Sequence, residues 1–254
     1  MKKALEFPSD VRPDFKGFSR EAFAFLEGLA KNNDRAWFAA NKAAYDEEVK
    51  FQMECLLAEF AGSRRPAGFP LLGDPARGMF RVHRDVRFAR DKSPYKTHAG
   101  AVMTRSGTKG DPGILYVHVE PGGCFISAGF YSPDRDFLAA WRATMAKRPG
   151  EFLDIAAPFG NPRSKYVLRH RGALKTMPRG FQEFAGTPIG EYLKWKHFLV
   201  AREIPDSVAR SRKLVDAIAE LAEVAMPLLE YGWAVHETAF EDDPRRHMRS
   251  GGED

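Results

Sequence analysis

The stretch "ILYVHVEPGGCFISAGFY", Ile114–Tyr131, predicts the centre of the fold. Its two halves, "ILYVHVE" and "CFISAGFY", are rich in apolar, aromatic and β-branched residues, which are typical of strands. The residues "EPGG" between them favour a tight turn. A further strand-like run, "THAGAVMT", precedes the pair at Thr97–Thr104. The middle of the chain therefore predicts an antiparallel meander built from hairpins.

Helical patterns lie on both sides of this meander. Ser19 can cap a helix that ends at "KNND", and Asp34 can cap a longer helix from Arg35 to about Phe60. After the strands, one helix runs from Ser132 to just before Pro149, and a long amphipathic helix runs from about Ser207 to Leu229. Helices at both ends and strands in the middle indicate an α+β fold with a central antiparallel sheet.

The expected domain organisation is simple. Residues 1–14 contain two prolines and no periodicity, so we expect an N-terminal arm. Residues 15–233 are expected to form a single α+β domain. The tail, 234–254, has few apolar residues towards its end, and we expect it to be disordered from about 241.

Composition indicates an ordinary globular protein. The chain has 254 residues, of which 44% are hydrophobic, so it can bury a sizeable core. No apolar run approaches the roughly 20 residues of a membrane span, and the start has no apolar signal-peptide core. The two cysteines, Cys55 and Cys124, lie in apolar patterns typical of small buried side chains. We therefore expect a soluble cytoplasmic protein with no membrane partner.

Two separate segments carry all the excess positive charge. Arg81–Arg105 holds seven Arg or Lys and two Asp, and Asn161–Gln182 holds six Arg or Lys and no acid. The other 207 residues carry a net charge of −6. If the two segments meet in space, they would focus a positive potential.

The first basic segment also has the pattern of a strand. In "FRVHRDVRF", Phe80–Phe88, apolar residues alternate with polar ones, which predicts a strand with one face in the core. Arg84 falls on the apolar face, so it needs a partner there or must emerge through it. The following "RDKSPYK" predicts a turn, because Asp91 and Ser93 can bond the backbone locally and Pro94 fixes φ.

Guanidinium and ammonium groups at this density suggest a site for a small anion, because they match phosphate and carboxylate groups. A second wall could come from the other basic segment. The predicted ligand-binding residues are Arg84, Arg87, Lys92, Tyr95, Lys96, Lys175 and Arg179. The preferred ligand is a small phosphorylated or carboxylated molecule, on which the protein could act as an enzyme.

Two alternatives stay open. One is a nucleic-acid-binding module, which the sequence pI near 9.2 allows but which lacks regular aromatic interleaving and any known motif. The other is a structural salt-bridge network in which Arg84 and Arg87 pair with Asp85 and Asp91.

No catalytic or metal site is predicted. His83, His98 and His118 lie in predicted strands and could meet Asp85 and Glu120 if the strands aligned, but their spacing matches no metal-binding motif. Nucleophile elbows and phosphate-binding loops are also missing from the sequence. The sequence assigns no cofactor, no catalytic residue and no oligomeric state.

Four pieces of the chain carry a family resemblance. They are "KNNDRAWF" (Lys31–Phe38), "RDVRFARDKSPYKT" (Arg84–Thr97), "LKTMPRGF" (Leu174–Phe181) and "LKWKHF" (Leu193–Phe198). The chain resembles the conserved hypothetical family called domain of unknown function 2461, over about residues 15–233. The resemblance implies no activity, cofactor or catalytic residue.

Overall fold

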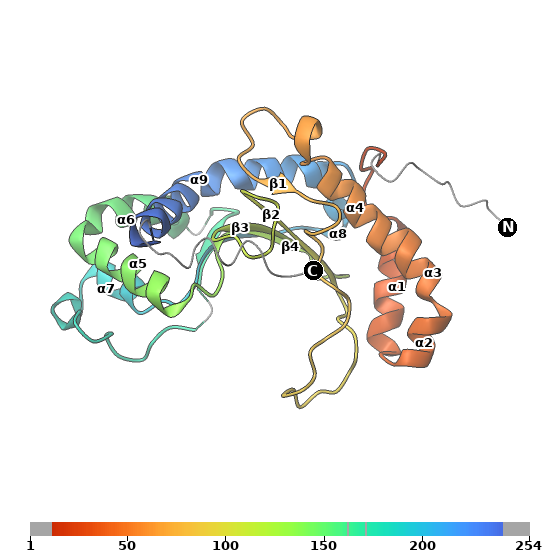
Figure 1. Ribbon diagram of the computed structural model, residues 1–254, viewed down its shortest axis with the longest axis horizontal. Helices are drawn as coiled ribbons and strands as arrows, with labels where there is room; N and C mark the ends of the chain where they lie inside the picture. The colour runs from red at the N-terminus through yellow and green to blue at the C-terminus, as the bar shows by residue number, and fades with distance from the viewer. Residues whose placement is uncertain (1–11, 162, 171, 241–254) are drawn as a thin grey trace. The chain divides into compact units, whose positions relative to one another are not determined.

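The computed structural model describes residues 12–161, 163–170 and 172–240. Six strands of this part of the chain form one sheet in the order β1-β2-β3-β4-β6-β5, with helices before and after them in the sequence (Figure 1). The pairs β1/β2, β2/β3 and β5/β6 run antiparallel. The predicted α+β fold with a central antiparallel sheet is confirmed.

The described chain divides into two compact units. The first contains 12–127 and Arg202–Glu223, and the second contains Ala128–Ala201 and 224–240. Three elements run from one unit into the other, so the division falls inside elements and not in a linker. These elements are β4 (Phe125–Phe130), β6 (Phe198–Glu203) and α9 (Lys213–Phe240). The single domain expected over 15–233 stays a prediction.

Most of the predicted arm and the tail from 241 onwards lie outside the described residues. No helix of the part that is described is long and apolar enough to cross a membrane.

The first unit begins with helices whose ends follow local side-chain chemistry. Ser19 accepts a hydrogen bond from the Ala22 N–H at the start of α1, and Asp34 accepts from the Trp37 N–H at the start of α2, as their sequence positions predict. The helices of this unit are α1 (Arg20–Lys31), α2 (Arg35–Ala40), α3 (Lys42–Ala44), the π-helical η1 (Tyr45–Lys50), α4 (Phe51–Ala58), the 3₁₀ turn η2 (Gly62–Arg64) and α8 (Asp206–Ala209).

The single helix predicted over 35–60 is therefore interrupted. Asn41 lies between α2 and α3, and its side-chain amide donates 2.8 Å to the Trp37 carbonyl. Such a local bond competes with the regular helical ladder. The helix predicted from Ser207 is also divided, because the Ser211 hydroxyl bonds the Val208 carbonyl between α8 and α9. α9 then continues to Phe240, well past the predicted end.

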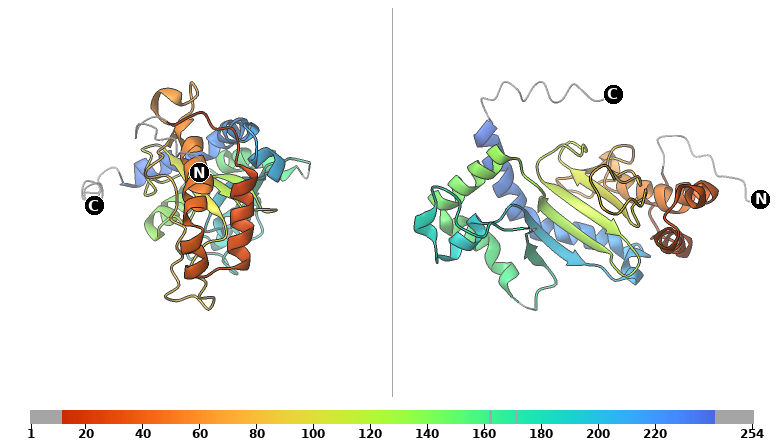
Figure 2. Two further views of the ribbon diagram at one scale, coloured as in Figure 1. Left: turned by 90° about the vertical axis from the view of Figure 1, so that its right-hand side faces the viewer. Right: turned by 90° about the horizontal axis from the view of Figure 1, so that it is seen from below.

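The hairpin predicted at the centre of the fold is present. β3 (Ile114–Val119) and β4 are neighbours in the sheet, and the Gly123 N–H donates 2.9 Å to the Glu120 carbonyl in the turn between them. β2 (Ala99–Thr104) lies beside β3 (Figure 2). The register places Ala99 opposite Val119. β1 (Leu72–Gly73) adds a short edge.

These strands supply part of the core. Ala101, Met103, Leu115, Val117 and Val119 are all at most 1% exposed. They alternate with residues that point to the other face of the sheet, among them Tyr116 and His118 of β3. That second face is the one on which the polar side chains described below lie.

The strand predicted over Phe80–Phe88 is wrong. This segment makes a single isolated bridge, between His83 and Tyr95, and Phe88 on the supposed core face is 96% exposed. The reason is local bonding: the Asp85 carboxylate accepts from the Arg87 N–H, and the Asp91 carboxylate accepts from the Ser93 N–H. Side-chain acceptors of this kind favour turns over a ladder.

The second unit has its own aromatic core. The fully buried Trp141 stacks on Phe198 with ring centroids 4.6 Å apart, and Phe152 packs edge-on against Phe198. The elements of this unit are α5 (Arg135–Lys147), α6 (Pro149–Ala156), α7 (Pro188–Leu193), β5 (Val167–Arg169), and the 3₁₀ turns η3 (Ala157–Gly160) and η4 (Gln182–Phe184).

Candidate functional site

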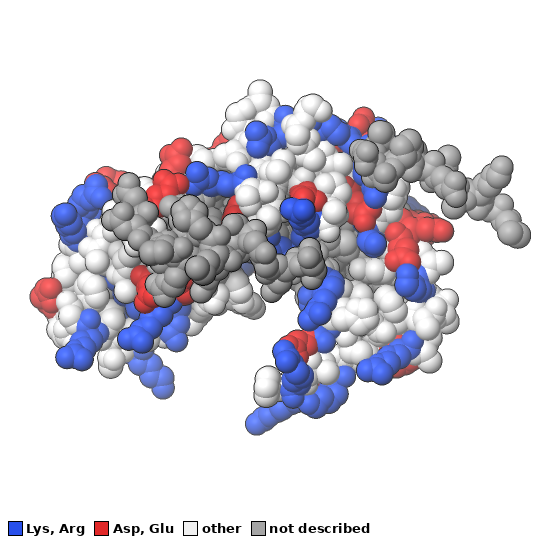
Figure 3. Space-filling model, in the orientation of Figure 1, with Lys and Arg blue, Asp and Glu red and all other residues white. Residues whose placement is uncertain are grey.

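The two basic segments belong to different units. Arg84, Arg87, Lys92, Tyr95 and Lys96 all lie in the first unit, in a loop that hangs from the sheet (Figure 1). Lys and Arg side chains gather over this loop (Figure 3).

The other two predicted ligand residues, Lys175 and Arg179, are exposed in the second unit, between β5 and η4. The site described here therefore contains only residues of the first unit.

Two arginines at the tip of the loop are paired with acids of the same loop. Arg84 donates to the Asp91 carboxylate, and Arg87 Nη2 lies 2.6 Å from Asp85 Oδ2. The pKa of Asp91 is held below its ordinary value by the Ser93 hydroxyl and then by Arg84, and Arg87 likewise lowers the pKa of Asp85. These are the partners that the structural alternative expected.

Lys92 and Tyr95 also have partners in the fold. Lys92 Nζ donates 2.9 Å to the Val86 carbonyl, which closes the loop on itself. Tyr95 is 6% exposed and stacks on Phe38 with centroids 4.2 Å apart. Its backbone is held by Asn33, whose amide donates 2.9 Å to the Tyr95 carbonyl and accepts 3.0 Å from the Tyr95 N–H.

Asn33 is a residue that sequence reasoning missed. It lies between α1 and α2, in "KNND", and Tyr95 lies in "KSPYK". Both pieces carry the family resemblance, and the contact between them joins the helices to the base of the basic loop.

A second group of cations surrounds Phe80 at the base of the loop. Lys96 Nζ lies 5.4 Å and Lys109 Nζ 5.5 Å from the centroid of the Phe80 ring, both within cation–π range. Lys96 Nζ also donates 2.9 Å to the Arg81 carbonyl. We call Arg81, Lys96 and Lys109 the Phe80 cation cluster.

The like charges of this cluster act on one another. Burial, followed by the charges of Arg81 and Lys109, lowers the pKa of Lys96 below its ordinary value. None of the three makes an ion pair with any residue of the described ranges. A nearby anion would offset the repulsion among these cations, so the electrostatics of the cluster favour anion binding.

Local structure fixes the members of the cluster. The Phe80 N–H donates to the Gly100 carbonyl, and the Lys96 N–H donates to the Val82 carbonyl. Lys109 lies in the turn between β2 and β3, where Asp111 accepts 2.6 Å from the Ser106 N–H. This turn brings Lys109 to the base of the basic loop, over the same Phe80 ring as Lys96.

A cleft of about 1090 Å³ opens beside the cluster, within the first unit. Phe80, Arg81 and Lys109 line it, together with Tyr45. Five of its lining side chains are cationic, and the two acids are Glu54 and Asp74. Its volume lies slightly above the roughly 300–1,000 Å³ typical of small-molecule sites.

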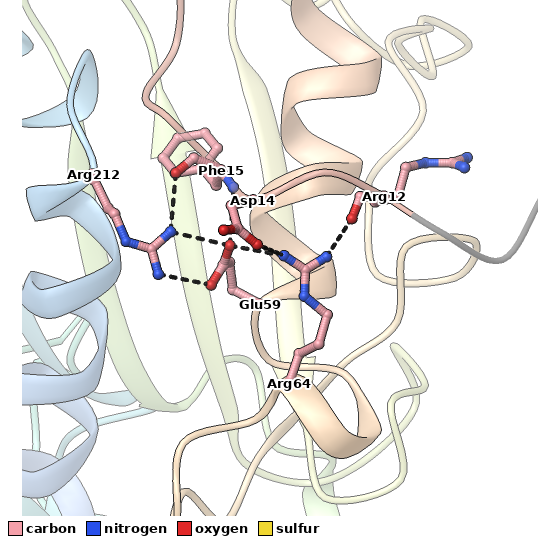
Figure 4. A network of polar contacts seen from close by, with 6 residues as sticks. All are labelled: Arg12, Asp14, Phe15, Glu59, Arg64 and Arg212. Carbon is pink, nitrogen blue, oxygen red and sulfur yellow. Dashed lines mark hydrogen bonds and ion pairs between the residues drawn. The ribbon is translucent and has the colours of Figure 1, made fainter. Parts of the chain in front are cut away.

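The cations on the other wall of the cleft already have acidic partners. Arg12 Nη2 lies 2.8 Å from Glu54 Oε2, and Arg64 Nη2 lies 3.0 Å from Glu59 Oε1. Arg64 also bonds Asp14 and the Arg12 carbonyl (Figure 4). Arg81 and Lys109 are therefore the lining cations that no described acid neutralises.

A third group of polar side chains lies on the same face of the sheet. The rings of His98 and His118 are 4.2 Å apart, and His118 Nε2 lies 3.1 Å from Glu120 Oε2. Burial, followed by the charge of His118, lowers the pKa of His98 to about 4. Burial also lowers the pKa of His118, against the opposing effect of Glu120.

Tyr116 lies between this histidine group and the Phe80 cation cluster. Its hydroxyl is 3.0 Å from His118 Nδ1, and its ring is 6.0 Å from that of Phe80. Among the described residues, His98, His118 and Glu120 are the group that could hold a metal ion.

Comparison with known proteins identifies the family of the chain but no characterised relative. No curated protein and no solved structure matches the chain. One family model, described as conserved hypothetical protein (DUF2461), matches residues 21–231. The resemblance seen in the sequence is confirmed, and the chain belongs to this family.

Proposed function

We propose that the protein binds a small phosphorylated or carboxylated molecule in the cleft beside Phe80. Arg81 and Lys109, which line the cleft, are its anion-binding side chains, and Lys96 adds a third cation, which lies over the Phe80 ring. Of the residues predicted from sequence, Lys96 keeps this role, and Arg81 and Lys109 join it.

The observation that carries the proposal is the crowding of charge around Lys96. The ammonium groups of Lys96 and Lys109 lie over one aromatic ring, and the charges of Arg81 and Lys109 contribute to the lowered pKa of Lys96. Like charges held together cost free energy in the absence of a counter-charge. A phosphate or carboxylate between them would make charge-assisted hydrogen bonds, which contribute about 1.5–3 kcal/mol each.

The size of the cleft favours a small molecule. Its volume suits a ligand the size of a nucleotide or sugar phosphate, and the Phe80 and Tyr45 side chains offer apolar surface for the uncharged part. The loop tip contributes less, because Arg84 and Arg87 are engaged by Asp91 and Asp85.

Nucleic acid is the weaker candidate. Binding of single strands depends on exposed rings on which bases stack and on a long cationic groove. The Phe80 ring is contacted by two ammonium groups, and the free cations are confined to one wall. A short phosphate-bearing ligand uses these groups better than a polymer does.

The proposal is tested by thermal unfolding at low salt, with pyrophosphate, nucleotides, sugar phosphates and dicarboxylates as probes. A probe at about 100 times its Kd should stabilise the fold by about 2.7 kcal/mol, which raises Tm by roughly 5–10 °C for a chain of this length. Lys109→Met keeps an unbranched side chain beside Phe80 and removes the charge, so it should abolish the shift. Lys147→Met, on the exposed side of α5, changes the net charge equally and should leave the shift intact.

Two results would count against the proposal. The first is that none of the probes shifts Tm. The second is that a probe shifts Tm equally in Lys109→Met and in the unmodified protein. Stabilisation only by oligonucleotides, with affinity that rises with their length and falls steeply with salt, would support the nucleic-acid alternative instead.

A further inference from the structure

The histidine group lies where two strands end side by side. His118 and Glu120 are two residues apart along β3 and its extension, so they point to the same face. β2 pairs with β3 so that Ala99 is opposite Val119. One step beyond this pair, His98 comes opposite Glu120 and diagonal to His118.

The distances suit a shared ion. One ligand atom of each residue lies within 4.8 Å of the other two, and His118 Nε2 and Glu120 Oε2 are 3.1 Å apart. Two ligands at 2.0–2.2 Å from a tetrahedral ion are about 3.4 Å apart. From the 4.8 Å limit, the third ligand atom has at most about 1.4 Å to move to reach that spacing.

We propose that His98, His118 and Glu120 form a binding site for a divalent first-row transition metal ion, of which Zn²⁺ is the probe. Two imidazoles and one carboxylate are a ligand set typical of Zn²⁺ and Fe²⁺, whereas Mg²⁺ and Ca²⁺ prefer oxygen ligands alone. Three protein ligands leave a coordination position open for water or another molecule.

The ligands have supporting partners of the kind that metal sites require. Thr97 Oγ1 donates 3.0 Å to Glu120 Oε1, which leaves Oε2 directed to His118. Tyr116 Oη lies 3.0 Å from His118 Nδ1. Such partners orient metal ligands and fix the imidazole tautomer.

The Tyr116 contact is compatible with metal at Nε2 of His118. A metal ion takes the Nε2 lone pair, so the ring proton resides on Nδ1 and donates to the Tyr116 oxygen. In the metal-free protein the proton can reside on Nε2 and donate to Glu120, with the Tyr116 hydroxyl donating to Nδ1. Because Tyr116 can accept or donate, both states satisfy the ring.

The fold also holds one of the imidazoles in place. Phe125 stacks on His118 with centroids 4.5 Å apart, and His118 is only 9% exposed. A ring packed in this way loses little freedom when it binds an ion, which favours affinity. The proposal rests on this geometry and does not depend on the anion site.

The experiment uses full-length, tag-free protein stripped with a chelator. Zn²⁺ binding is measured by calorimetry, and Co²⁺ binding by visible absorption, whose intensity reports a low-symmetry site of four or five ligands. We expect one ion per chain. His98→Asn and Glu120→Gln should each weaken binding by about 100-fold or more, beyond the 10–100-fold typical of lost supporting partners.

The control is His170→Asn, which removes an exposed histidine of the second unit and should bind Zn²⁺ as the unmodified protein does. Glu120→Gln can still bond Thr97 and His118, so it keeps the fold if His98→Asn does not. Absence of one-to-one binding, or binding that survives both substitutions, would overturn the proposal and leave an ordinary His–Glu hydrogen bond. Because the readout is metal alone, failure here leaves the anion site untouched.

Discussion

Removing the Glu59 carboxylate should destabilise the first unit. Glu59, at the end of α4, is 7% exposed and accepts 2.9 Å from the Phe15 N–H, 3.0 Å from Arg64 Nη2 and 3.1 Å from Arg212 Nη2 (Figure 4). It thereby joins the N-terminal segment, α4 and the start of α9, all within that unit.

The size of the effect follows from the exposure of its partners. Breaking a fully buried ion pair costs about 3–5 kcal/mol, because one charge is left buried and alone. The Arg212 side chain is 51% exposed and Arg64 is 28% exposed, so water can hydrate both after the change. We therefore expect Glu59→Ala to lower the free energy of unfolding by about 2–3 kcal/mol, with Tm falling by roughly 5–10 °C.

The assay is urea unfolding at pH 7, monitored by circular dichroism, with Glu27→Ala on the exposed face of α1 as the matched control. The pair Glu59→Ala and Arg212→Ala should be less than additive, since both remove the same bonds. A loss within 0.5 kcal/mol of the control, or full additivity, would refute the argument.

The same carboxylate predicts a pH dependence. Burial acts to raise the pKa of Glu59, but hydrogen bonds from Arg212 and the Phe15 N–H outweigh it, and the pKa lies below its ordinary value. Because the pKa is lower in the folded state, the ionised carboxylate stabilises the protein above the unfolded pKa of about 4.3. This stabilisation is lost as pH falls through the folded pKa. Glu59→Gln should flatten the decline in stability below about pH 4.5, and an unchanged decline would contradict this.

Three further changes test other contacts. Asn33→Ala leaves the Tyr95 N–H and carbonyl without their side-chain partner, so the free energy of unfolding in urea should fall by about 1–3 kcal/mol. An unchanged free energy of unfolding would contradict a stabilising role for these two hydrogen bonds. Gly100→Ala places a Cβ 2.6 Å from the Tyr116 hydroxyl, so that ring must move, and Zn²⁺ affinity measured by calorimetry should fall about 10-fold. Arg87→Ala removes an exposed ion pair and should leave Tm unchanged. A large fall in Tm would show instead that this ion pair stabilises the fold.

Local chemistry accounts for what the sequence predicted correctly. The caps Ser19 and Asp34 act within three residues, and the hairpin through Gly123 closes across a tight turn. Such features need no distant partner, so residue type and spacing are enough to identify them.

The failures come from partners that lie far away in the chain or from competing local bonds. The alternation over Phe80–Phe88 satisfied the pattern of a strand, but its pairing stops after the His83–Tyr95 bridge, where Asp85 and Asp91 bond nearby backbone N–H groups. Lys109 approaches Lys96 only because β2 and the turn after it fold back.

The sequence named the histidines and Glu120 but could not predict which of them meet. His98 and His118 are 20 positions apart, and only the register of β2 and β3 brings them together. Asn33 gave no signal, because an asparagine after a helix usually serves the helix end.

The pKa of Lys96 in solution tests the anion site most directly. It can be followed by NMR through the ¹³Cε and ¹⁵Nζ signals, assigned by their loss in Lys96→Arg. The account predicts a pKa below the ordinary value of about 10.4 in the free protein, a rise toward or above that value when pyrophosphate binds, and a partial rise in Lys109→Met. An ordinary pKa that neither pyrophosphate nor Lys109→Met alters would contradict it.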